Sequence, residues 1–170
     1  MNKLRLILGD QLNINHSWFK ENNSKITYVM MEVKEETSYV LHHAQKIIAT
    51  FAAMRFFAEQ LQQKGFEVIY FKINDKQNKQ SFYQNINKTI KEKNIGELQY
   101  LEPDEYRLST ELKKLESIEN IKVESVDTEH FLVPKLYAKD FFSEKKHWRM
   151  EEFYRNMRKK FSILMEEDKP

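Results

Sequence analysis

The segment LRLILGDQL, residues 4–12, determines the fold expected of this chain. Its first half, residues 4–8, has the length and apolar composition of a short buried β-strand. Gly9, Asp10 and Gln11 follow at once, and polar residues directly after a buried strand are typical of the first strand of an open α/β sheet. Ligands of such sheets bind at that edge. Glycine there tolerates a positive φ or close approach of a ligand, although the same residues also form ordinary turns.

The rest of the chain alternates between strand-like and helical patterns. Four further segments are short and apolar enough to be strands: 26–33, 67–73, 98–101 and 121–126. Three segments with helical spacing of apolar residues lie between them: 38–64, 79–94 and 109–115. Ser38 is the expected N-cap of the longest helix, and Gly65 its stop. The alternation predicts an α/β fold, a Rossmann-like (flavodoxin-like) five-stranded parallel sheet with helices on both faces.

Composition limits the class of protein. The chain has 170 residues, of which 41% are hydrophobic and 32% charged, as expected of one globular domain with its own core. No apolar run has the length of a membrane span, and the N-terminus lacks the layout of a signal peptide, so we expect no membrane partner. The absence of cysteine excludes disulfides, a thiol nucleophile and thiolate metal ligands within these residues, and fits a cytoplasmic location.

Motifs of nucleotide and hydrolase chemistry are missing. The sequence contains no P-loop, no Gly-x-Gly-x-x-Gly fingerprint and no Gly-x-Ser-x-Gly elbow. Adjacent His42 and His43 on a helix would point about 100° apart, which makes joint binding of one metal unfavourable. From the residues alone we expect a small-ligand pocket near Asp10, Glu36 and the start of the long helix.

The C-terminal part differs in character. It combines aromatic residues with a basic run that contains Lys145, Arg149, Arg155 and Arg158, and a helix is expected at 150–165. The basic residues form either a solvated helix face or a surface for contact with DNA or another domain.

Four segments resemble a known family: LILGDQL (6–12), MEVKEETSYVLHHAQKI (31–47), AAMRFFAEQLQQKGFEVIY (52–70) and MEEFYRNMRKKFSILMEEDKP (150–170). They are similar to the N-terminal domain of photolyase-related proteins, the bacterial (6-4) photolyases and prokaryotic cryptochromes that carry an iron–sulfur cluster. The resemblance implies that residues 1–135 bind an antenna chromophore of the 6,7-dimethyl-8-ribityllumazine type. It also implies that residues 136–170 are a helical extension that begins an interdomain linker.

The resemblance assigns binding roles to individual residues of this sequence. The family loop under the chromophore matches Gly9, Asp10 and Gln11. Positions along the edge of the chromophore match Glu36, Tyr39 and His43, and Thr50 matches a deeper one. Asp10 and Glu36 are the expected hydrogen-bond partners.

In the family, FAD and the [4Fe-4S] cluster belong to a helical C-terminal domain, which this sequence does not contain. We therefore expect a truncated photolyase-related protein that harvests light but is not itself catalytic, whereas the whole family member repairs DNA by a light-driven lyase reaction. Two alternatives stay open at this point. One is a stand-alone module for a nucleotide- or flavin-type ligand, and the other is an accessory domain that contacts DNA through Arg149, Arg155 and Arg158.

Overall fold

The computed structural model describes residues 1–144, 146–167 and 169. The chain forms two compact units, Met1–Thr128 and Glu129–Pro170. The boundary expected from the sequence, after residue 135, lies slightly further along the chain. Lys145 of the basic run lies outside the described residues.

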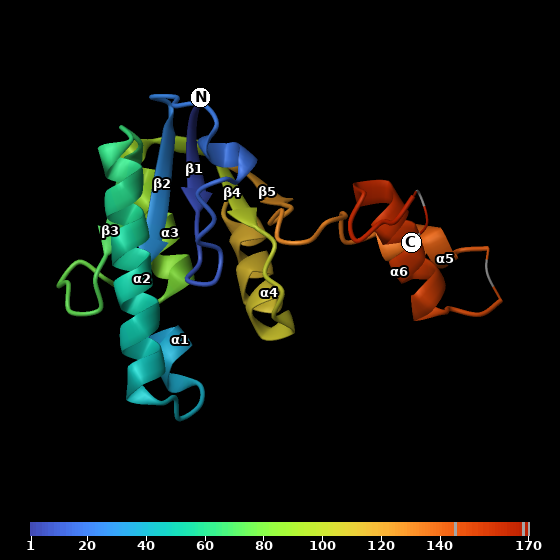
Figure 1. Cartoon of the computed structure of the whole chain (residues 1–170). Coiled ribbons are helices and arrows are strands. Elements are labelled where there is room, and N and C mark those ends of the chain that lie inside the picture. The colour runs from blue at the N-terminus through green and yellow to red at the C-terminus, as the bar shows by residue number, and fades with distance from the viewer. Residues whose placement is uncertain (145, 168, 170) are drawn as a thin grey trace. The chain divides into compact units, whose positions relative to one another are not determined.

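The first unit is built on a five-stranded parallel sheet (Figure 1). Its strands are β1 (Asn2–Leu6), β2 (Ile26–Met31), β3 (Glu67–Phe71), β4 (Ile95–Leu101) and β5 (Lys122–Val126). They lie in the order β3-β2-β1-β4-β5, and every neighbouring pair is parallel. The predicted α/β class is confirmed. The order is that of the Rossmann fold and differs from the flavodoxin order 2-1-3-4-5.

Helices cover both faces of the sheet, as predicted (Figure 1). Those of the first unit are α1 (Lys34–Ser38), α2 (Ala44–Gln63), α3 (Phe82–Lys93) and α4 (Tyr106–Lys113), with the short 3₁₀ helices η1 (Ser17–Phe19) and η2 (Lys114–Ser117). Side chains of β1 and of the residue after it lie in two cores: Ile7 packs with α2, and Leu4 and Leu6 pack with α3 and α4. Within the described ranges, no helix has the length and apolar composition that crossing a lipid bilayer requires.

The long helix predicted from Ser38 begins only at Ala44, and a separate short helix, α1, precedes it. Helix α1 ends at Ser38, whose hydroxyl donates a hydrogen bond to the carbonyl of Lys34 and so closes α1 instead of capping the next helix. His43 takes the N-cap role, because its Nδ1 accepts a hydrogen bond from the backbone N–H of Gln45 at 3.2 Å. Residues 39–43 therefore form a connector between α1 and α2.

The predicted end of the long helix is correct. Gly65 has a φ of +85°, a conformation that only glycine adopts without strain. The N–H of Gly65 bonds to Gln62, and that of Phe66 bonds to Leu61, which is the Schellman pattern of helix termination.

The described residues of the second unit form two helices, α5 (Tyr137–Phe142) and α6 (Met150–Phe161). They pack through aromatic side chains, with the rings of Phe141 and Phe142 against that of Phe153. Helix α6 is shorter than predicted, because Ser162 adopts a left-handed φ of 53° and stops it.

An ion pair between the buried carboxylate of Glu32 and the partly exposed guanidinium of Arg55 joins β2, β3 and α2 at the carboxyl edge of the sheet. Glu32, directly after β2, is fully buried and accepts hydrogen bonds from Arg55 Nε and Nη2 at 2.6 and 2.9 Å, the Tyr70 hydroxyl at 2.8 Å and the Ile73 N–H at 2.8 Å. Burial alone raises the pKa of Glu32, but the hydrogen bonds from Arg55, Ile73 and Tyr70 outweigh it and hold this pKa below its usual value. Glu32 is thus a structural carboxylate.

We predict that Glu32→Gln lowers the free energy of unfolding by about 2 kcal/mol at neutral pH, because the amide cannot neutralise Arg55. The folded-state pKa of Glu32 is depressed, so its contribution is complete above the unfolded-state pKa of about 4.3 and is lost as the pH falls through the folded-state value. Urea unfolding of both proteins from neutral pH to about pH 3 measures this.

Glu67→Gln is the matched control, because Glu67 pairs with Lys93 on the surface with both side chains almost half exposed. Its expected cost is about 0.5 kcal/mol or less. An equal loss in the two variants, or a difference for Glu32→Gln that persists undiminished at acid pH, would contradict the prediction.

Candidate functional site

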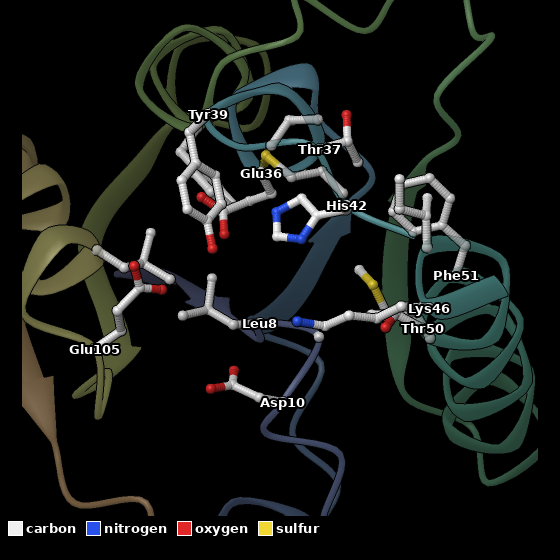
Figure 2. Close-up of a pocket in the computed structure, with 17 residues that line it drawn as sticks. Leu8, Asp10, Glu36, Thr37, Tyr39, His42, Lys46, Thr50, Phe51 and Glu105 are labelled. Carbon is white, nitrogen blue, oxygen red and sulfur yellow. The ribbon is translucent and has the colours of Figure 1, made fainter. Parts of the chain in front are cut away.

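The first unit contains a cavity of about 260 Å³ at the carboxyl edge of the sheet (Figure 2). It lies at the topological switch point, because its walls include the loop after β1 and the start of α4, which follows β4. Its floor is apolar: Leu8, Met31, Val33, Ile47, Phe51, Met54, Phe82 and Leu108. Its remaining lining residues are Gly9, Asp10, Glu36, Thr37, Tyr39, His42, Lys46, Thr50 and Glu105. An apolar floor with a few polar groups is the usual composition of a small-molecule site.

Gly9 makes room for helix α2. A Cβ at this position would lie 3.0 Å from both Thr50 Cγ2 and Met54 Sδ, closer than ordinary van der Waals contact. The φ of Gly9 is not positive, so the conformational role expected for this glycine is wrong. Close approach is what requires glycine here, and the approaching group in the protein is α2, which brings Met54 into the cavity wall.

Asp10 and Lys46 supply opposite charges to the cavity (Figure 2). Asp10 leaves the end of β1, and Lys46 lies in the first turn of α2. Within the described part of the chain, neither side chain has a hydrogen-bond or ion-pair partner. A carboxylate acceptor and an ammonium donor are therefore both available to a ligand.

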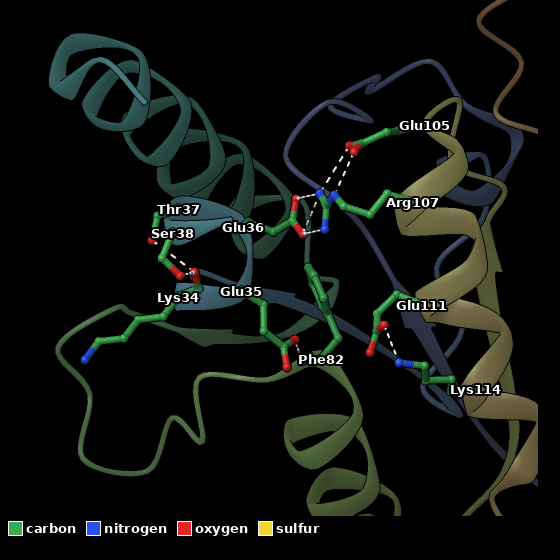
Figure 3. Close-up of polar contacts among 10 residues, drawn as sticks. All are labelled: Lys34, Glu35, Glu36, Thr37, Ser38, Phe82, Glu105, Arg107, Glu111 and Lys114. Carbon is green, nitrogen blue, oxygen red and sulfur yellow. Dashed lines mark hydrogen bonds and ion pairs between the residues drawn. The ribbon is translucent and has the colours of Figure 1, made fainter. Parts of the chain in front are cut away.

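Arg107 of α4 ties two walls of the cavity together (Figure 3). Its guanidinium donates to both carboxylate oxygens of Glu36 at 3.1 Å and to Glu105 at 2.7 Å. It also lies over the ring of Tyr39, 3.9 Å from the ring centroid. The hydrogen bonds to Glu36 raise the pKa of Arg107 above its usual value. Sequence reasoning missed Arg107, since nothing in the local pattern of α4 indicates a partner 71 residues earlier.

The connector between α1 and α2 forms part of the cavity wall. Tyr39 and His42 both line the cavity, and their rings meet edge to face with centroids 4.9 Å apart. The sequence predicts both on the first turns of a helix, whereas they lie on the non-helical connector. This places the imidazole of His42, and not that of His43, at the cavity.

Of the seven residues predicted to bind a cofactor, five line the cavity: Gly9, Asp10, Glu36, Tyr39 and Thr50. The other two have structural partners. Gln11 is buried, accepts a hydrogen bond from the Leu8 N–H and donates one to the Leu101 carbonyl, so it joins the ends of β1 and β4. His43 caps α2.

The three arginines predicted to contact DNA or another domain lie at or in α6 of the second unit. Arg149 occupies the N-cap position. Arg155 forms an ion pair with Glu151 at 2.6 Å, and Arg158 donates to the carbonyl of Ile163 and lies over the ring of Tyr154. Two of the three cations thus already have partners within their own unit.

The first unit is thus a Rossmann-like domain with a cavity of mixed apolar and polar lining at its switch point. The family model of deoxyribodipyrimidine photo-lyase-related proteins matches residues 5–170. The chain is also 35% identical over 171 aligned residues to a (6-4) photolyase of Agrobacterium fabrum, an alignment that covers all of this chain and 34% of that relative. The chain belongs to the photolyase-related family, which confirms the resemblance drawn from the sequence.

We predict that Arg107→Lys accelerates amide hydrogen exchange in residues 39–43 about tenfold, equivalent to about 1.4 kcal/mol of local opening free energy. A lysine ammonium cannot span two carboxylate oxygens and cover the Tyr39 ring together, as the planar guanidinium does. Exchange mass spectrometry of peptides that cover the connector measures the rate.

Lys114→Ala serves as the control, since it breaks the exposed ion pair with Glu111 shown in Figure 3 and does not touch the connector. Exchange in residues 39–43 should stay at the wild-type rate in this variant. Equal rates in all three proteins would show that Arg107 does not hold the connector.

Proposed function

We propose that the first unit binds a lumazine-type chromophore in the switch-point cavity and acts as the antenna part of a photolyase-related DNA-repair protein. The main support for this proposal is that one cavity at the sheet edge is lined by Gly9, Asp10, Glu36, Tyr39 and Thr50. These residues come from three separate segments of the chain.

The cavity suits a flat heterocycle with a hydroxylated side chain. The apolar floor, formed by residues such as Leu8 and Met54, covers a ring system. Asp10 accepts hydrogen bonds from hydroxyl or N–H groups, and Lys46 donates to carbonyl oxygens. Arg107 keeps Glu36 and Tyr39 in place around the ligand. A bound lumazine supplies absorption in the violet, which a chain of ordinary side chains lacks.

Our proposal gives these 170 residues no part in the repair reaction itself. The chain spans 34% of the length of the curated (6-4) photolyase that it matches. It contains no cysteine with which to bind an iron–sulfur cluster. We therefore propose that the residues here bind and orient the antenna and that they bind neither FAD nor the cluster.

Spectroscopic titration tests the proposal. The purified chain, freed of bound small molecules, is titrated with 6,7-dimethyl-8-ribityllumazine and with flavin mononucleotide while the ligand's fluorescence is recorded. We predict that the lumazine binds more tightly and that Asp10→Asn weakens its binding at least about tenfold, because the variant removes a charged acceptor.

Asp75→Asn is the matched control. Asp75 follows β3 near the same sheet edge, does not line the cavity, and bonds to the Gln77 N–H through an oxygen that asparagine retains. Its affinity for the lumazine should equal that of the wild type. Tighter binding of flavin mononucleotide would favour the stand-alone nucleotide- or flavin-binding module, and no binding of either ligand would reject the antenna proposal.

A further inference from the structure

His42 carries a buried polar atom that the protein leaves without a partner. Among the residues that the structure describes, its Nε2 is the buried side-chain nitrogen or oxygen that makes no hydrogen bond. Such an atom costs a folded protein about 1–3 kcal/mol. A native structure tolerates this cost where water, an ion or a ligand satisfies the atom.

Of water, an ion and a ligand, the location of His42 favours a ligand as the missing partner. Its imidazole lines the cavity, and Figure 2 shows the ring among the side chains there. Glu36 is already bound through both oxygens by Arg107. His42 thus offers a hydrogen-bonding atom without a protein partner, whereas the carboxylate of Glu36 is already bound.

The ring of His42 is held in position by its neighbours. The edge-to-face contact with Tyr39 restrains it on one side, and Arg107 in turn restrains Tyr39 through the cation–π contact. A polar atom that is both restrained and unsatisfied is preorganised for one partner.

We propose that His42 determines which ligands the cavity accepts, through a hydrogen bond from its Nε2 to the polar edge of a planar heterocycle. Neutral imidazole nitrogen is a donor in one tautomer and an acceptor in the other, so it matches either a carbonyl oxygen or a ring nitrogen. The ligand class is a heteroaromatic that carries such groups at its rim, and an analogue without them leaves Nε2 unsatisfied. This inference rests on the proposed function and adds to it the group that selects the ligand.

Two variants separate a ligand-selecting role from a structural one. His42→Phe keeps a ring of similar shape and removes both nitrogens, and His42→Gln keeps a hydrogen-bonding group. If Nε2 has no protein partner, the ligand-free His42→Phe protein is at least as resistant to urea as the wild type. The same variant should bind the lumazine about tenfold more weakly or worse, with partial recovery in His42→Gln.

The adjacent histidine provides the control. His43→Asn retains an N-cap side chain for α2 and leaves the cavity lining unchanged, so it should bind the lumazine like the wild type. A second ligand, 2,3-dimethylnaphthalene, has neither carbonyl groups nor ring nitrogens. The wild type should prefer the lumazine over this hydrocarbon, and His42→Phe should lose much of that preference.

The outcomes distinguish this inference from the proposed function. A loss of stability in ligand-free His42→Phe, or lumazine binding as tight as in the wild type, overturns the role of His42. If the wild type binds riboflavin and not the lumazine, the antenna proposal fails, and the same variants then test His42 on riboflavin. If none of these heterocycles binds, both proposals fail.

Discussion

The ion pair between Arg107 and Glu36 is the interaction on which the geometry of the cavity depends. In the strand order β3-β2-β1-β4-β5, β2 and β4 flank β1, so the segments that follow them meet above its end. Arg107 belongs to the segment after β4, and Glu36 to the segment after β2. Their contact closes the space over Gly9 and Asp10. The bidentate geometry fixes direction as well as distance, which a single point charge cannot do.

The geometry of the cavity also depends on helix α2, which packs closely enough on the sheet to form part of the cavity floor. Gly9 permits this approach, since any side chain there would press on Thr50 and Met54. The Glu32–Arg55 pair anchors the same helix to the sheet beyond β2. A carboxylate that lines the cavity, Asp10, and a structural carboxylate, Glu32, thus follow neighbouring strand ends. They differ in burial: Glu32 is fully buried and fully bonded, whereas Asp10 is exposed and unbonded within the described residues.

Sequence reasoning located the site but not the contacts that shape it. Polar residues that follow buried strands indicate the carboxyl edge of the sheet, because parallel strands bring their carboxyl ends together. This rule pointed to Gly9, Asp10 and Glu36. The break between α1 and α2 was not predictable in this way, since Ser38 is an equally good residue for capping a helix and for bonding back to Lys34. Arg107 was missed because its partner is remote in sequence. Because the break between α1 and α2 was not predicted, the sequence also did not indicate that His42, and not His43, lies at the cavity.

The connector between α1 and α2 has a kinetic consequence. It is a short non-helical segment between two helices, and its last residue, His43, bonds to the first turn of α2 through its carbonyl and its ring. At the other end of the connector, Arg107 holds Glu36 by hydrogen bonds and lies over the ring of Tyr39. If a molecule bound in the cavity leaves past this connector, its residence time would follow the lifetime of the contacts of Arg107. Because Arg107 and Glu36 are both partly exposed, dissolved salt weakens their ion pair, and release of such a molecule would become faster as ionic strength rises.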